Sequence, residues 1–269
     1  MKRLVILVSL LSFCLVGCNH YYYLPNVHNV PMFVEKNEYR LSGFCGSETE
    51  SNSIELQSAY SVTNHTALMF NFMKAKGVDS ENTSSWGKGD YYEGALGYYK
   101  SLGTFSSYNK PFGLSKSVAL VATFEVYGGY AKNNQHHEYD KYGSISDLSY
   151  TKIFIQPSIS VTSDLADYAL SARISRVSFD KIDYYLSKYS SSSHSKELID
   201  LINTKVSYLF EPAVTMRFGW KYVKLQLQIG GTSNLTNKNL KFDNINASVG
   251  ICFSLAKRYK TAPLKELSN

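Results

Sequence analysis

Proline and long apolar runs are both scarce in this chain. Only 6 prolines occur among 269 residues, which excludes a proline-rich stalk. After Val16 no apolar run approaches the roughly 20 residues that a transmembrane helix needs. Charge of one sign is not in excess either, because 28 Lys and Arg stand against 22 Asp and Glu and the basic residues are scattered. We therefore expect no nucleic-acid binding.

Motifs for common enzyme chemistry are missing as well. The chain has no Gly-x-Ser-x-Gly elbow, no Cys-x-x-Cys pair, no phosphate-binding glycine loop and no dinucleotide fingerprint. The densest set of potential metal ligands is His136, His137, Glu138 and Asp140. Adjacent residues of an extended chain point in opposite directions, which favours a solvated loop there. His194-Ser195 follows a run of serines without any organised nucleophile motif. We predict no metal, no cofactor and no catalytic residue.

The first eighteen residues have the layout of an export signal. Lys2 and Arg3 precede an apolar stretch from Leu4 to Val16, which is too short to span a bilayer comfortably. The stretch ends in Leu15-Val16-Gly17-Cys18, which resembles a bacterial lipobox. This resemblance implies that residues 1–17 are removed and that Cys18 carries acyl chains such as palmitate. Two or more such chains anchor a protein stably in a membrane.

Apolar residues recur at every second position in about ten segments after residue 37. Successive side chains of a strand point to opposite faces, so each segment has one apolar face and one polar face. The longest reach the roughly 9–11 residues that a membrane-spanning strand needs. The segments are Tyr39–Gly46, Ile54–Val62, Leu68–Phe72, Tyr91–Tyr99, Val118–Val126, Lys152–Val161, Asp167–Ile174, Val206–Phe218, Val223–Ile229 and Ile245–Leu255.

The connections between these segments alternate between short and long, as they do in outer-membrane barrels. The join at 102–117 is too long for the short class and fits this scheme poorly. In the long connection 175–205, the apolar spacing of residues 196–204 predicts a short amphipathic helix at the barrel mouth. The short connections are 63–65, 163–164 and 219–221, and the other long ones are 77–89, 131–149 and 232–244.

One further pattern concerns the last segment. Ser248-x-Gly250-x-x-Phe253-x-Leu255 is similar to the last-strand signature of bacterial outer-membrane barrels, although a basic tail follows it here. In composition and layout, the mature chain resembles the uncharacterised outer-membrane β-barrel lipoproteins of Gram-negative bacteria. We expect an all-β fold, an antiparallel up-and-down barrel of about ten strands (8–12) of the membrane type. A soluble β-sandwich or barrel is the alternative.

The expected organisation has four parts. Residues 1–17 form the signal, 18–37 a lipidated N-terminal linker, 38–255 the barrel, and 256–269 a C-terminal tail. With short turns in the periplasm, an even strand count puts both chain ends there, where an acyl anchor in the inner leaflet would hold Cys18. The predicted location is the outer membrane.

Charged residues fall on the polar face of the predicted strands. A barrel of eight to ten strands is just wide enough for side chains to fill it, so opposite charges would pair inside. A salt-bridged interior is the interpretation we favour, and a narrow polar pore or a small-ligand cavity is the alternative. The nine residues are Arg40, Glu55, Glu93, Glu125, Lys152, Arg173, Glu211, Arg217 and Lys224.

Two cysteines remain after the signal and the lipid site, Cys45 and Cys252. The alternation places them on opposite faces of the first and last strands, about seven residues of rise apart, or roughly 20 Å. A disulfide needs Cα atoms within about 7 Å, so we predict two unbridged thiols.

Three functions fit these observations. The first is a non-enzymatic barrel whose long loops contact another envelope protein, a glycan or lipopolysaccharide. The second is a barrel that binds or passes a small polar ligand. The third is a barrel enzyme that modifies membrane lipid through His194 and Ser195.

Overall fold

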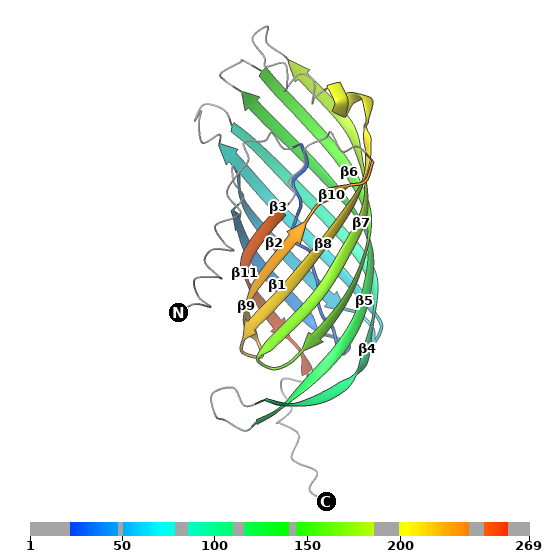
Figure 1. Ribbon diagram of the computed structural model, residues 1–269, viewed down its shortest axis with the longest axis vertical. Coiled ribbons are helices and arrows are strands. Elements are labelled where there is room, and N and C mark those ends of the chain that lie inside the picture. The colour runs from blue at the N-terminus through cyan, green and yellow to red at the C-terminus, as the bar shows by residue number, and fades with distance from the viewer. Residues whose placement is uncertain are drawn as a thin grey trace, which may run out of the picture.

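The computed structural model describes residues 22–47, 51–78, 86–109, 116–139, 144–185, 199–236 and 245–257. Within them the chain forms a closed antiparallel barrel of ten strands, as predicted (Figure 1). Sequential strands pair with one another, β1 pairs with β11, and a β8–β9 pairing completes the ring. Among the described residues, no helix is both long enough and apolar enough to cross a membrane.

The strands differ greatly in length. An additional two-residue strand, β10 (Ser233–Asn234), follows β9 and pairs with β8. The ten barrel strands are β1 (Tyr39–Ser47), β2 (Ser51–Ser61), β3 (Thr66–Val78), β4 (Trp86–Asn109), β5 (Lys116–Tyr139), β6 (Ser144–Thr162), β7 (Ala166–Tyr185), β8 (Val206–Gly219), β9 (Val223–Gly231) and β11 (Ile245–Leu255).

In most strands the apolar face points outward and the polar face points into the barrel, although β3 also turns Ala67, Met69 and Met73 inward. Leu170 in β7 is 59% exposed, whereas its neighbours along the strand, Ala169 and Ser171, are buried. Exposed apolar side chains form a belt around the barrel, including Leu68, Phe70, Leu96, Ile153, Ile155, Leu170, Ile174, Leu225, Ile229, Val249 and Ile251. A soluble barrel would bury this face, so the belt identifies the fold as the membrane type.

Tyrosines mark both edges of the belt. At the edge near the tight turns lie Tyr39, Tyr60, Tyr98, Tyr168 and Tyr222, and at the other edge lie Tyr92, Tyr130 and Tyr208. Amphipathic rings at the two membrane–water interfaces are typical of membrane barrels. Beyond the second edge the outward positions become charged, with exposed Lys74, Lys76, Lys88, Lys132 and Arg176.

The two ends of the barrel differ as the sequence predicts. Tight turns at 62–65, 163–165 and 220–222 gather at one end, and the strand ends that lead into the long connections gather at the other, which we call the long-connection end (Figure 1). A helical turn at 199–203 lies at the long-connection end, within the helix that was predicted, and the side chain of Leu201 is fully buried there. The rest of the predicted helix, residues 196–198, lies outside the described residues.

The join at 102–117 has a different structure from the loop that its length suggests. β4 and β5 stay paired as far as Asn109 and Lys116, with a register shift between Ser101 and Gly103. The paired strands therefore extend beyond the tight-turn end of the barrel wall (Figure 1). Glycines on both faces of β4, including Gly94 and Gly97, blur the period-two pattern on which the sequence interpretation relied.

The two cysteines are unbridged, as predicted. Cys45 faces outward and Cys252 is buried on the inner face. The predicted separation is wrong, because Cys252 pairs with Ser42, only three residues from Cys45. Opposite faces of the sheet, rather than distance along the barrel wall, keep the thiols apart.

Leu170→Arg should lower the free energy of unfolding in phospholipid vesicles by about 1–3 kcal/mol, because it places a charge inside the apolar belt, two residues from its edge at Tyr168. Asn134→Arg is the matched control, since Asn134 also faces outward but lies beyond the tyrosine edge. It should change stability little. Urea titration in vesicles measures both variants, and equal effects would contradict the assignment of the belt to lipid.

Candidate functional site in the barrel lumen

The lumen is filled by the chain's own N-terminal segment. Residues 22–33 run inside the barrel, residues 34–37 connect them to β1, and this lumen segment (22–33) is visible in blue within the ring of strands (Figure 1). All its residues from Tyr22 to Phe33 are buried except Leu24, which is half-buried. From the sequence we expect a linker here, and nothing in its pattern indicates a place in the lumen.

Apolar clusters hold the lumen segment at both of its ends. Tyr22 and Tyr23 pack with Leu201 and with inward side chains of β6 and β7 near the long-connection end. Phe33 packs with Ala67 and Tyr99 near the tight turns. The segment therefore crosses the barrel lengthwise, with Tyr22 toward the long connections and Phe33 toward the tight turns.

Between these clusters, inward side chains of the wall bind the backbone of the segment. Glu55 accepts a hydrogen bond from the Val27 N–H at 2.9 Å. Gln228 accepts one from the His28 N–H at 2.6 Å and donates one to the His28 carbonyl at 2.9 Å. Further wall donors reach the carbonyls of the segment: Gln57 to Val27 at 2.8 Å, Gln156 to Asn29 at 2.8 Å, Arg217 to Val30 at 2.7 Å and Arg40 to Met32 at 3.1 Å.

Glu125 binds two consecutive backbone N–H groups of the segment. Its carboxylate accepts hydrogen bonds from the N–H groups of Met32 at 3.0 Å and Phe33 at 2.8 Å. Met32 has a φ of 59°, a left-handed conformation that is uncommon outside glycine. Consecutive N–H groups around such a residue can converge on one anion, and here that anion is a fully buried side chain of β5.

All nine charged residues that the sequence assigned to the interior have buried side chains. One group lies around Tyr23 and Asn26. Lys152 and Glu211 form an ion pair at 3.0 Å, and the Tyr23 hydroxyl donates to Glu211. Arg173 pairs with Glu93 at 3.2 Å and also donates to the Asn26 side chain at 2.7 Å. The ion pairs therefore incorporate groups of the lumen segment.

The second group lies nearer the tight turns. Lys224 pairs with Asp167 at 2.6 Å and donates to the Ser163 carbonyl, also at 2.6 Å. Arg40 lies 3.9 Å from Asp167 and 3.7 Å from Glu38. These contacts tie the start of β1 to the turn between β6 and β7, so the end of the lumen segment is fixed to the wall.

Sequence reasoning missed several members of this site. Asp167 falls on the polar face of its predicted strand, so the same alternation that found the nine could have included it. Glu38, two residues before Arg40, shares the inward face of the first strand and could have been included in the same way. Tyr23 and Asn26 belong to a stretch with no period, and nothing in their spacing indicates where they lie. Neighbours along a strand could be placed from the sequence, but the residues that fill the barrel could not.

A cavity between Asn26, His28 and the wall at Glu211 and Gln228 has a volume of about 10 Å³, enough for about one water molecule. Within the described part of the chain, no group of three His, Cys, Asp or Glu side chains could hold a metal ion. His136 contacts Asp147 at 2.7 Å, and Asp140, His194 and Ser195 lie outside the described residues.

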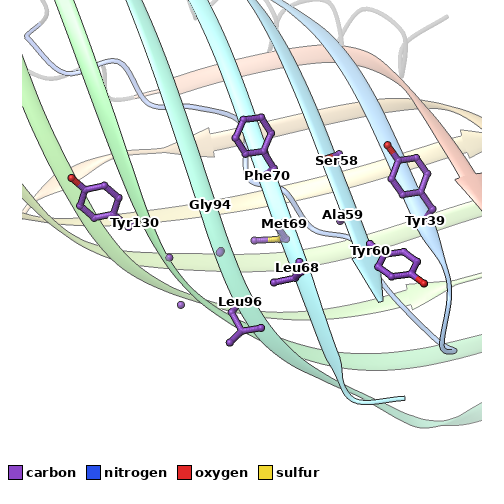
Figure 2. Close-up of a pocket in the computed structure, with 13 residues that line it drawn as sticks. Tyr39, Ser58, Ala59, Tyr60, Leu68, Met69, Phe70, Gly94, Leu96 and Tyr130 are labelled. Carbon is purple, nitrogen blue, oxygen red and sulfur yellow. The ribbon is translucent and has the colours of Figure 1, made fainter. Parts of the chain in front are cut away.

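The outer wall carries a larger hollow. It measures about 690 Å³ and opens toward the lipid side of β1 to β5. Small residues form part of its lining, and in Figure 2 the side chains of Phe70, Leu96 and Tyr130 surround the backbone at Gly94. We call this feature the wall hollow, and it is lined by Tyr39, Ser58, Ala59, Tyr60, Leu68, Met69, Phe70, Gly94, Ala95, Leu96, Gly128, Gly129 and Tyr130.

Glu125→Ala should lower the free energy of unfolding by about 2–4 kcal/mol, because it leaves the buried N–H groups of Met32 and Phe33 without their acceptor. Glu138→Ala is the control on the same strand, since the Glu138 side chain is 41% exposed and lies 4.0 Å from His136. Glu138→Ala should lower the free energy of unfolding much less. If urea titration gives the same loss for both variants, the carboxylate of Glu125 does not hold the lumen segment.

No protein-family model and no curated protein sequence matches the chain. Among solved structures, it is similar to the transport unit of the autotransporter AIDA-I from Escherichia coli, with 11% identity, a TM-score of 0.32 and coverage of 85% of this chain and 93% of that one. An outer membrane channel from Pseudomonas putida F1 gives 12% identity, a TM-score of 0.35 and coverage of 89% and 100%. The translocator domain of the autotransporter NalP from Neisseria meningitidis gives 10% identity, a TM-score of 0.35 and coverage of 81% of this chain and 86% of that one. At such identities and scores the likeness reaches no further than barrel architecture.

Proposed function

We propose that this chain is a non-enzymatic outer-membrane lipoprotein whose barrel is closed by its own N-terminal segment and whose long connections contact other molecules of the cell envelope. One observation carries this proposal, namely the occupied lumen. The segment is bound by ion-paired and hydrogen-bonded wall residues along its length, and about 10 Å³ remains beside Asn26 and His28. A closed barrel of this kind is a rigid support for the loops at its mouth.

The path of the lumen segment also bears on the lipid anchor. Cys18 lies four residues before Tyr22, a reach of at most about 14 Å. Tyr22 packs at the long-connection end, whereas the hydrocarbon core of a bilayer is about 30 Å thick. With the long connections outside the cell, this path favours an acyl anchor in the outer leaflet over the inner-leaflet anchor and periplasmic N-terminus expected from the sequence.

The other candidate functions gain less support. Passage of a small polar ligand requires the lumen segment to leave the barrel, against both ion-pair groups. A lipid-modifying activity through His194 and Ser195 depends on residues outside the described part of the chain. The partners in this proposal remain membrane lipid together with an envelope protein, a glycan or lipopolysaccharide.

Deleting residues 22–36 should convert a non-conducting barrel into a pore, because the polar inner face would then enclose water. Single-channel recordings in planar bilayers should show stepwise conductance for the shortened chain and none for the full-length protein. A chain lacking residues 258–269 retains the lumen segment and should stay closed. Comparable conductance by the full-length protein would mean that the segment does not close the barrel.

A peptide tag inserted after Asn19 should bind antibody on intact cells, because the chain reaches Tyr22 at the end that faces outward. Binding that requires permeabilised cells would contradict the outer-leaflet anchor.

In the same strain, Cys18→Ala should abolish incorporation of labelled palmitate, whereas the control Cys45→Ala should not. Normal labelling of the Cys18 variant would contradict lipidation at that residue.

A further inference from the structure

Four lysines gather on the outward face of three neighbouring strands, just beyond the tyrosine edge of the belt on the long-connection side. We call Lys74, Lys76, Lys88 and Lys132 the lysine patch. All four are exposed, and they belong to β3, β4 and β5. Asp90 lies among them, 3.9 Å from Lys74. Four lysines and one aspartate leave a formal charge of 4 − 1 = +3. Glu138 and Asp147 lie at the edge of the patch, where both contact His136, the residue opposite Lys88.

The arrangement of the patch is unfavourable without an anion. Lys76 and Lys88 are directly opposite each other on antiparallel strands, and like charges in such a pair repel. Aromatic rings hold two of the ammonium groups near the wall, with Lys88 over Trp86 at 5.6 Å and Lys74 over Phe72 at 5.9 Å. A phosphate bound between the lysines would turn this repulsion into attraction.

The wall hollow spans β1 to β5, and on β3, β4 and β5 it lies deeper in the belt than the lysine patch. On β3, Phe70 precedes Lys74 by four residues, which is about 13 Å of strand. On β5, Gly128 precedes Lys132 by the same number. Cross-strand pairing of Phe70 with Gly94 and of Gly94 with Tyr130 makes the hollow continuous across the strands. A cationic surface thus stands directly above an apolar recess.

We propose that the lysine patch and the wall hollow form one binding site for an acylated lipid that carries phosphate. The phosphate lies among the lysines, and an acyl chain fills the hollow beside Gly94. The leaflet in contact with the patch is the one that faces the long connections, so this site rests on the orientation given in the proposed function. In that leaflet the occupant is lipid A, whose several phosphates and acyl chains match four lysines spread over three strands.

Binding can be measured by native mass spectrometry of the purified, detergent-solubilised protein titrated with lipid A. Lys76→Gln combined with Lys88→Gln should raise the apparent dissociation constant about tenfold or more. Lys36→Gln combined with Lys100→Gln removes the same charge from exposed positions at the tight-turn end and should have little effect. Equal affinities for the two double variants would overturn the proposal.

The hollow is tested by a second pair of variants. Gly94→Leu should fill part of the recess and weaken lipid A binding by several-fold. Gly43→Leu is the matched control, because Gly43 also faces outward and an added Cβ at either glycine meets no atom within 4 Å. If lipid A binding depends on the lysines but is unchanged by Gly94→Leu, the patch acts without the hollow and the single-site proposal is wrong.

Two further titrations identify the lipid. Inorganic phosphate should not compete at concentrations comparable to lipid A, and phosphatidylglycerol should bind more weakly because it carries one phosphate. Equal binding of either probe would overturn the assignment. These measurements use purified protein and do not touch the lumen segment. A failure here therefore leaves the conductance and tag experiments, and the function they test, unaffected.

Discussion

The structure depends on satisfying the backbone of an extended segment that no strand pairs. Buried N–H and C=O groups without partners are costly, and residues 22–33 lie inside a sheet whose own backbone groups are already paired. Wall side chains take over this task. Glu55, Glu125 and Gln228 each bind main-chain atoms of the segment directly. The charged interior is therefore a set of ligands for a peptide and not merely a set of mutual ion pairs.

The same strands meet a second environment on their other face. The outward positions carry an apolar belt between two tyrosine edges, and the inward positions carry charges and amides. Alternation along each strand assigns every residue to one environment, and a one-residue slip in register would exchange them. This alternation explains why Cys45 and Cys252 stay apart. Cys252 pairs with Ser42, only three residues from Cys45, but the two thiols point to opposite faces of the sheet.

Much of the barrel could be predicted from the sequence because strands are local. Period two identified the ten strands, the tight turns and the inward charges, and the apolar spacing at 196–204 located the helix. Prediction failed where a residue's position depends on distant parts of the chain. The lumen segment has no periodicity, since its contacts are with wall residues far away in the sequence. The β4–β5 extension failed for another reason. Residues 102–109 do not alternate, since Leu102 and Phe105 would fall on opposite faces of a regular strand, and the register shifts between Ser101 and Gly103.

The threaded segment constrains the order in which the barrel assembles. The seam between β1 and β11 joins residues that are far apart in sequence, such as Tyr39 and Leu255. From β1 to β9, by contrast, each strand pairs with the one that follows it in the chain. Pairing across so long a chain costs the most loop entropy and forms late. Glu55 on β2 and Glu125 on β5 can bind the segment while that seam is still open. The protein then closes its sheet around an extended segment of its own chain, so that enclosure of the segment and completion of the ring are a single event.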